Sequence, residues 1–182
     1  MILFLDMDSV LCSFVQGTCN VHHLDYPKVF AAWPKGEYRL DYGLRMLNAE
    51  IWSPIEKAGP SFWADLLPTP WCEQLLDLAQ YADAYYIATV PWNADSAKGK
   101  IRWMHKHIDP EFNRYFLCGH GKGLLGRPGA MLIDDSEKHC QDFAAQGGTA
   151  LLLPRPWNYG AGTPEDTIQN AKEILQSETL NG

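Results

Sequence analysis

The stretch Ile2-Leu3-Phe4-Leu5-Asp6-Met7-Asp8 is a short apolar run that ends in two carboxylates. A second run of the same kind, Ala130-Met131-Leu132-Ile133, ends in Asp134-Asp135. Short apolar runs bounded by polar residues are typical of strands that are buried on both faces of a parallel sheet. Ligands bind outside the carboxyl ends of such strands. If the two strands are neighbours, four carboxylates converge at one edge of the sheet.

Carboxylates this close repel one another and raise each other's pKa unless a cation lies between them. Mg²⁺ is a hard cation that takes oxygen ligands, so it is the ion we expect here. The alternative is that these residues only form turns and helix N-caps. Because two such pairs occur, each at the end of a strand, we predict that Asp6, Asp8, Asp134 and Asp135 form a Mg²⁺ site.

The remaining pattern alternates strands with helices, which predicts an α/β fold with a Rossmann-like, doubly wound parallel sheet and right-handed crossovers. We expect strands at 2–5, 84–89, 131–133 and 149–153, with a short fifth at 115–118, and helices at 71–82, 95–108, 137–146 and 164–177. In the helix over 95–108, the spacing of Ile101, Met104 and Ile108 predicts one buried stripe.

Residues 15–68 break this alternation. They contain Trp33, Trp52 and Trp63 with several prolines and glycines, and they show helical stretches near 24–33 and 43–51. A long insertion after the first strand is usually functional. We predict a small helical cap over the strand ends at 15–68, on a core domain formed by 1–14 and 69–182. A packing extension without function is the alternative.

Composition limits the classes of function. The 182 residues include 46% hydrophobic ones, enough for a sizeable core, and carry a net charge of -7. That charge argues against binding to a nucleic-acid backbone, although a local cation can still make one pocket attractive to a small anion. Neither a signal peptide nor a membrane span is visible in the sequence.

The five cysteines are scattered and contain no Cys-x-x-Cys pair, which predicts reduced thiols and a cytoplasmic location. A zinc site from Cys12, Cys19, His22 and His23 is a weaker interpretation, because their spacing matches no standard zinc motif.

Phosphoryl transfer explains the order of these motifs along the chain. Asp6 can act as the nucleophile toward phosphorus, and Asp8 as general acid and then base. Thr89 at the end of the second strand and Lys122 in a glycine-rich loop can neutralise the phosphate oxygens. A structural threonine and a solvated lysine are the simpler interpretations of the last two residues taken singly.

These motifs resemble those of the haloacid dehalogenase superfamily of phosphohydrolases, most closely the 5'(3')-deoxyribonucleotidase family. The resemblance covers nearly the whole chain and includes Asp6-Met7-Asp8-Ser9-Val10-Leu11, Ile51-Trp52, Phe62-Trp63, Thr89-Val90-Pro91 and Leu132-Ile133-Asp134-Asp135. It implies an aspartyl-phosphate on Asp6 and a Mg²⁺ ion held by the Asp6 carboxylate, the Asp8 backbone carbonyl and Asp134, with Asp135 assisting. It also implies that Lys122 holds both the phosphate and Asp6.

The sequence departs from the family pattern in two places. Ser9 stands where the family usually has glycine, so its side chain either narrows the space at the phosphate or adds a hydroxyl contact. The loop between Lys122 and Asp134 contains Gly123, Gly126 and Gly129 and is longer and richer in glycine than the family pattern.

Aromatic side chains in the cap suggest a nucleobase, because stacking on an aromatic ring contributes about 1–3 kcal/mol per base. The candidates for a base pocket are Phe14, Trp52, Phe62, Trp63 and Trp92, with Trp52 first. Most buried aromatic residues only pack the core. Arg39 and Arg45 are more simply solvated charges than contacts to a phosphate or base edge.

The leading hypothesis is therefore a Mg²⁺-dependent phosphatase of (deoxy)ribonucleoside monophosphates. A sugar phosphatase, a polynucleotide end-phosphatase and a silent nucleotide-binding protein are the alternatives; the acidic net charge argues against the second and the complete motif set against the third. We expect a small nucleotide as partner, with neither nucleic acid nor membrane, and a homodimer remains open.

Overall fold

The computed structural model describes residues 1–113, 116–117 and 120–181. Its sheet has five parallel strands in the order β3-β2-β1-β4-β5. They are β1 (Ile2–Leu5), β2 (Ala84–Ala88), β3 (Phe116–Leu117), β4 (Ala130–Asp134) and β5 (Thr149–Leu152). The four longer strands confirm the predicted ones. Of the expected fifth strand, Tyr115 and Cys118 lie outside the described residues.

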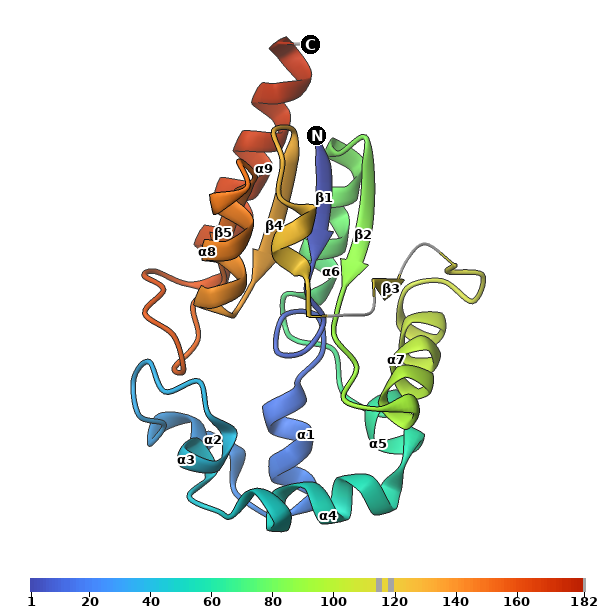
Figure 1. Cartoon of the computed structure of the whole chain (residues 1–182), viewed down its shortest axis with the longest axis vertical. Coiled ribbons are helices and arrows are strands. Elements are labelled where there is room, and N and C mark those ends of the chain that lie inside the picture. The colour runs from blue at the N-terminus through green and yellow to red at the C-terminus, as the bar shows by residue number, and fades with distance from the viewer. Residues whose placement is uncertain (114–115, 118–119, 182) are drawn as a thin grey trace.

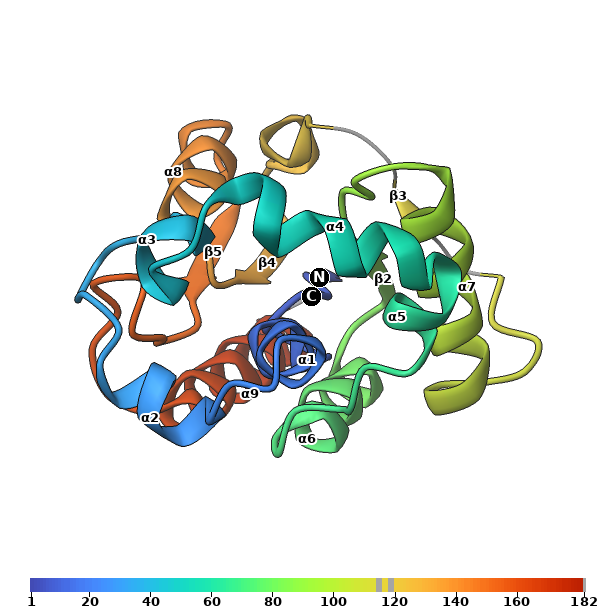
Figure 2. The same ribbon diagram turned by 90° about the horizontal axis from the view of Figure 1, so that it is seen from below.

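Helices cover the sheet on both faces, so the doubly wound α/β fold is confirmed. The core helices are α6 (Cys72–Asp77), η1 (Leu78–Tyr81), α7 (Ala94–His107), η2 (Lys122–Leu125), α8 (Glu137–Ala145) and α9 (Pro164–Asn181). Figure 2 shows α6 and α9 on one side of the sheet and α8 on the other. Trp103 and Met104 of α7 belong to the same apolar cluster as Leu75 of α6. Strands that are covered on both faces must be apolar at every position, which is why β1 and β4 are unbroken apolar runs.

Successive residues of β1 enter different parts of the core. Leu3 and Leu5 belong to the larger apolar cluster, whereas Phe4 packs with Phe143 of α8 in a smaller cluster. The ring centroids of Phe4 and Phe143 are 6.0 Å apart. This alternation fixes the register of β1, because a shift by one residue would reverse every side chain.

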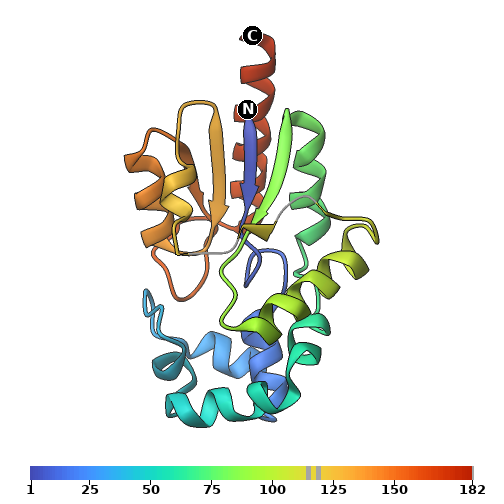
Figure 3. The same cartoon turned by 45° about the vertical axis from the view of Figure 1, so that its right-hand side comes forward.

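The carboxyl ends of the three central strands coincide. Leu5 of β1 pairs with Ile87 of β2 on one side and with Ile133 of β4 on the other. The arrows of all three strands point toward the same end of the molecule in Figure 3. The residues that follow these strands therefore meet at one place. This place is also the topological switch point of the sheet, because the connections from β1 and β2 run toward one edge of the sheet and those to β4 and β5 run toward the other.

Five helices between β1 and α6 lie beyond these strand ends (Figure 1). They are α1 (Phe14–Val21), α2 (Tyr26–Ala31), α3 (Leu40–Leu44), α4 (Asn48–Ala58) and α5 (Pro60–Ala64). The prediction of a single helical stretch near 43–51 is wrong. Arg45 follows α3 in a left-handed conformation, with φ 56°, and this interrupts the helix before α4 begins.

Helix α7 connects the core to this helical segment through α5. A Cβ atom at Gly99 would lie 2.4 Å from the carbonyl oxygen of Pro60, so only glycine allows the two helices to approach this closely. The expected stripe of α7 is wrong at Ile101, which is 40% exposed. The residues that α7 buries are Ser96, Gly99, Lys100, Trp103 and Met104.

None of the helices within the described ranges is long and apolar enough to cross a membrane. The four described cysteines, Cys12, Cys19, Cys72 and Cys140, are buried free thiols.

Candidate active site

The loop after β1 is closed by its own backbone. The Met7 carbonyl oxygen accepts hydrogen bonds from the backbone N–H groups of Leu11 and Cys12, both at 2.9 Å. The N–H of Ser9 donates to the carbonyl oxygen of Cys12 at 2.7 Å. This tight turn places Asp6 and Asp8 on the same side of the strand ends while giving them different partners.

Ser9 adopts a left-handed backbone conformation, with φ 64°, and its side chain lines the cavity described below. This conformation costs an L-residue other than glycine roughly 1–2 kcal/mol. Glycine would avoid this cost, so Ser9 carries backbone strain.

We expect Ser9→Gly to raise the free energy of unfolding by about 0.5–1 kcal/mol, because the strain relieved exceeds the extra chain entropy of glycine. Urea unfolding measures the change. Ser9→Ala is the matched control, since it removes the hydroxyl but keeps the Cβ atom and the strain. Equal stability of the two variants would contradict the strain argument.

Asp8 is held by a lysine that the sequence analysis missed. Lys100 Nζ donates to Asp8 Oδ2 at 2.6 Å and to Thr89 Oγ1 at 2.8 Å. The lysine is fully buried, and its ammonium group lies 5.2 Å from the centroid of the Trp63 ring. The Asp8 side chain is 29% exposed and reaches the cavity. Lys100 therefore holds the Asp8 carboxylate in place and leaves it accessible from the cavity.

Asp6, Asp134 and Asp135 form a buried cluster in which one ligand atom of each lies within 4.8 Å of the others. Lys122 Nζ donates to Asp6 Oδ1 and, at 2.7 Å, to Asp134 Oδ2. Burial works against its charge, but the charges of Asp6 and Asp134 raise the pKa of Lys122. The family resemblance implies that Lys122 holds Asp6, and the structure shows this contact together with a second one to Asp134.

The glycine-rich loop explains how Lys122 reaches this position. Lys122 begins the short helix η2, which packs against α8. A Cβ atom at Gly126 would lie 2.2 Å from the carbonyl oxygen of Phe143. Glycine is required there so that η2 can lie against α8, which sets the lysine at the cluster.

Asp134 is the carboxylate with the most partners. Its Oδ1 accepts from the backbone N–H of Ser136 at 2.8 Å, and its Oδ2 contacts Lys122 and, at 3.1 Å, His139 Nδ1. Burial would raise its pKa, but the charge of Lys122 and these hydrogen bonds leave the pKa of Asp134 below its ordinary value. Asp134 is therefore a carboxylate ion at neutral pH.

For Asp6 and Asp135, neighbouring groups do not offset the effect of burial on the pKa. Burial, with the charges of Asp134 and Asp8 adding to it, raises the pKa of Asp6 to about 6 despite Lys122. Burial and the charges of Asp134 and Asp6 raise the pKa of Asp135 well above its ordinary value. Asp135 Oδ2 accepts a hydrogen bond from Trp157 Nε1 at 2.6 Å.

These residues fit a divalent cation. When all three carboxylates are ionised, they and the one ammonium group leave two negative charges in a buried place, and the repulsion adds to the burial that raises the pKa of Asp6 and Asp135. Two unit charges at this separation repel by about 3–4 kcal/mol at an effective dielectric constant of 20. A Mg²⁺ ion takes oxygen ligands and would offset that repulsion. Among the described residues, no comparable cluster of ligand atoms is formed by Cys12, Cys19, His22 and His23, so the structure does not support a zinc site there.

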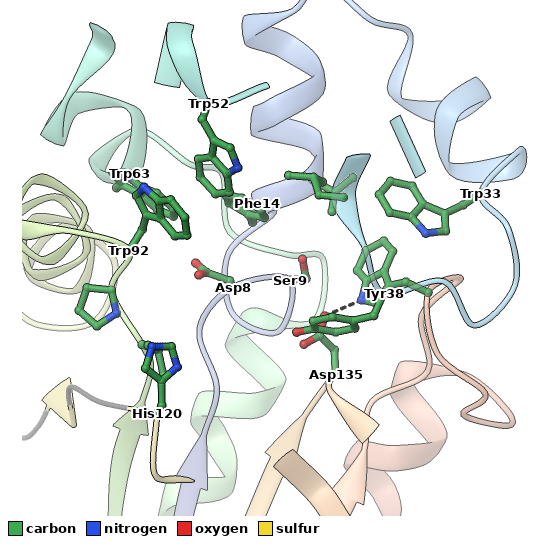
Figure 4. A pocket seen from close by; sticks show the side chains of 15 residues that line it. Asp8, Ser9, Phe14, Trp33, Tyr38, Trp52, Trp63, Trp92, His120 and Asp135 are labelled. Carbon is green, nitrogen blue, oxygen red and sulfur yellow. Dashed lines mark hydrogen bonds between the residues drawn. The ribbon is translucent and has the colours of Figure 1, made fainter. Parts of the chain in front are cut away.

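A cavity of about 410 Å³ opens at this edge of the sheet, and it is lined by Asp135 of the cluster, whereas Asp6 and Asp134 are buried and do not line it. Asp8, Ser9 and Asp135 line its floor, and Figure 4 shows aromatic side chains around it. Of the five candidates for a base pocket, four line the cavity: Phe14, Trp52, Trp63 and Trp92. Phe62 packs behind them, edge-on to Phe14 and Trp63.

Trp52 and Trp92 stack face to face, with centroids 4.7 Å apart and planes inclined by 6°. Trp92 is 58% exposed, so the pair forms the outer wall of the cavity. Trp63 stacks on Phe14 deeper in, at 5.4 Å. Arg39 is paired with Asp41 at 2.7 Å on the surface, as expected for a solvated charge.

Other residues at the site also escaped the sequence analysis. Tyr38, from the segment between α2 and α3, lines the cavity beside Asp135 (Figure 4). The charge of Asp135 raises the pKa of Tyr38, which keeps the phenol protonated and able to donate. Lys100 had a usable signal, since a lysine among buried helix positions needs a charged partner. Trp157 and His139 had none, because their contacts come from the tertiary fold.

Comparisons with known proteins agree with this geometry. The model of one family, described as 5' nucleotidase, deoxy (pyrimidine), cytosolic type C protein, matches residues 1–174. No curated protein gives a significant match.

Several solved structures share the fold. A haloacid dehalogenase-like hydrolase from Xanthomonas campestris is 11% identical, with a TM-score of 0.60, and the match covers 100% of this chain and 94% of that one. The HAD hydrolase YfnB from Bacillus subtilis, bound to magnesium, is 12% identical, with a TM-score of 0.57 and coverage of 96% and 97%. A HAD hydrolase from Deinococcus radiodurans, with bound phosphate and sodium, is 13% identical, with a TM-score of 0.52 and coverage of 99% and 95%.

At these identities the solved structures establish only the fold, and the assignment of the chain to a family rests on the match to the family model. It spans the first strand, the aromatic helical segment and both lysines of the site. The chain is thus a phosphomonoester hydrolase of the haloacid dehalogenase superfamily, and it belongs to the family of cytosolic type C deoxy (pyrimidine) 5' nucleotidases.

Proposed function

We propose that this protein is a Mg²⁺-dependent phosphatase that hydrolyses (deoxy)ribonucleoside monophosphates to nucleoside and phosphate. One observation carries the proposal: a single cavity of about 410 Å³ joins the acidic floor to an aromatic wall. Its size is within the range of ligand pockets, about 300–1,000 Å³. The floor suits a phosphate with its metal ion, and the wall suits the flat apolar face of a base.

The first half-reaction transfers the phosphoryl group to the protein. An Asp6 carboxylate oxygen attacks phosphorus, and the bond from phosphorus to the ester oxygen breaks. Asp8 donates its proton to the leaving nucleoside oxygen. Lys122 and Thr89 hold the phosphate oxygens, and Lys100 keeps Asp8 beside the leaving group.

The second half-reaction releases phosphate. Asp8, now a carboxylate, takes a proton from water, and the water oxygen attacks phosphorus as the bond to Asp6 breaks. Asp6, Asp134 and Asp135 would hold Mg²⁺, together with the backbone carbonyl of Asp8. The bound ion would neutralise the phosphate charge as it builds up during transfer. Magnesium in the related YfnB supports this choice of ion.

The other parts of the proposal concern partners and location. The net charge of -7 favours a mononucleotide over a polynucleotide. The family description names a cytosolic type and a deoxy pyrimidine substrate, and we propose both for this chain. A homodimer remains compatible with the proposal.

Phosphate release from a panel of substrates tests the proposal. The panel contains deoxy- and ribonucleoside 5'- and 3'-monophosphates, ribose 5-phosphate, glucose 6-phosphate and a 5'-phosphorylated oligonucleotide, each with Mg²⁺ and with EDTA. We expect turnover of nucleoside monophosphates that requires Mg²⁺. Turnover of sugar phosphates alone would retain the chemistry and reject the nucleotide, and release only from the oligonucleotide would reassign the enzyme to polynucleotide ends.

Trp52→Ala tests the aromatic wall. We expect kcat/KM for a nucleoside monophosphate to fall by about 5- to 150-fold, because a lost stacking contact of about 1–3 kcal/mol corresponds to that range. The control is a substrate without a base, ribose 5-phosphate, whose kcat/KM should stay within about threefold of wild type. An equal loss on both substrates would show that Trp52 supports the fold of the cap rather than the base.

A further inference from the structure

The loop between β5 and α9 brings a tryptophan to the acidic cluster. Trp157 Nε1 donates to Asp135 Oδ2 at 2.6 Å, and both residues are buried. Asn158 Nδ2, next in the chain, donates to the backbone carbonyl oxygens of Asp135 and Leu153, at 2.8 and 2.9 Å. The loop therefore holds both the side chain and the backbone of Asp135.

The Trp157 ring also packs against the segment 26–38, which lies beyond the strand ends. Its centroid is 5.2 Å from that of Trp33 and 6.2 Å from that of Phe30. The backbone N–H of Gly36 donates to the carbonyl oxygen of Pro156 at 2.9 Å. The segment 26–38 is thus docked on the loop that carries Trp157.

A buried cation stiffens this contact. The Arg155 guanidinium lies 4.8 Å from the centroid of Trp157, 5.1 Å from that of Phe30 and 4.9 Å from that of Trp71. Three rings around one guanidinium limit the rotation of the Trp157 ring, because cation–π contacts strengthen when they are desolvated. The indole N–H is therefore held toward Asp135 by the packing of Trp33, Phe30 and Arg155 against the ring.

We infer that Trp157 is a positioning residue of the metal site. Its N–H occupies Asp135 Oδ2 and so leaves Oδ1 as the oxygen that can face the cation. The ring takes its orientation from the docked segment 26–38, so the cap contributes to the geometry of the metal site through Trp157. The inference rests on the proposed function for its cation, and it concerns binding of Mg²⁺ rather than the identity of the substrate.

Hydrogen-bond donors behind a metal ligand typically change metal affinity by 10- to 100-fold when they are removed. Trp157→Phe removes the N–H but keeps an aromatic ring for Trp33, Phe30 and Arg155. The control is Trp103→Phe, which removes a buried indole N–H that donates to the Leu66 carbonyl oxygen at 2.7 Å, away from Asp135.

Isothermal titration with MgCl₂, without substrate, is the test. We expect Trp157→Phe to raise the dissociation constant for Mg²⁺ by about 10- to 100-fold and Trp103→Phe to leave this constant within about twofold of wild type. Wild-type affinity in Trp157→Phe, or an equal loss in both variants, would overturn the inference. If the wild-type protein does not bind Mg²⁺, the metal part of the proposed function fails instead.

A measurement on the unmodified protein covers the case in which Trp157→Phe does not fold. In ¹H–¹⁵N spectra of the wild type, the assigned indole N–H resonance of Trp157 should shift on addition of Mg²⁺, because its acceptor becomes a metal ligand. The Trp103 resonance should stay in place. No shift at Trp157 under saturating Mg²⁺ would overturn the inference.

Discussion

Asp6→Asn is expected to lower kcat by at least about 10⁴-fold, the scale of loss when a nucleophile is removed from a catalytic group that acts as a unit. An amide nitrogen or oxygen does not replace the carboxylate as nucleophile toward phosphorus. The substitution keeps the side-chain volume and removes a buried charge whose pKa is already raised to about 6. We therefore expect the variant to fold, so that the loss reflects chemistry.

The measurement has two parts. Initial rates give kcat, and acid-quenched wild-type protein mixed with radiolabelled substrate should carry a phosphoryl group that hydroxylamine removes, as an acyl phosphate does. Asp6→Asn should carry none. The control is Asp65→Asn, an exposed carboxylate on the surface, which should behave as wild type. Comparable labelling of Asp6→Asn would place the nucleophile elsewhere.

Lys100→Met is expected to lower kcat/KM for nucleoside monophosphates by about 10²- to 10⁴-fold, the contribution of a positioned general acid. The lysine holds Asp8 at 2.6 Å and Thr89 at 2.8 Å, so its loss frees both side chains. Methionine keeps an unbranched side chain of similar length in the buried place beside Trp63. Because Asp8 remains partly exposed to the cavity, water can solvate its charge, and we expect the fold to persist.

A substrate with a good leaving group separates positioning from packing. An aryl phosphate such as p-nitrophenyl phosphate needs no proton from Asp8 when its bond to phosphorus breaks, so Lys100→Met should lose far less kcat/KM on it. Lys106→Met, an exposed position on the same helix, is the control. An equal loss on both substrates would mean that Lys100 acts on the phosphate or the fold and not through Asp8.

The strands were predictable because each is a local pattern. Residues 2–5 and 130–133 are apolar at every position, and short runs of this kind are typical of strands at the centre of a parallel sheet, where both faces are buried. The carboxylates that follow them were predictable as a group for the same reason, since neighbouring parallel strands end together. The glycine-rich loop gave no such guidance, and only its packing on α8 locates Lys122.

Two of the predicted helical features are wrong. Helix α7 does not bury Ile101, because it packs on α5 and buries Lys100, which binds Asp8, rather than presenting its most apolar stripe to the sheet. The stretch 43–51 is not one helix, because Arg45 takes a left-handed conformation that sequence preference does not favour. In α7, tertiary contacts outweighed a small local preference.

The sequence by itself determined the sheet, the acids at its edge and the presence of an aromatic segment, because burial on both faces of a strand leaves a pattern within four or five residues. Only the tertiary structure decided which groups support those acids. Lys100 lies 92 residues from Asp8 and Trp157 22 residues from Asp135. Contacts of that separation depend on where crossover helices and loops return to the sheet, and no local periodicity encodes that path.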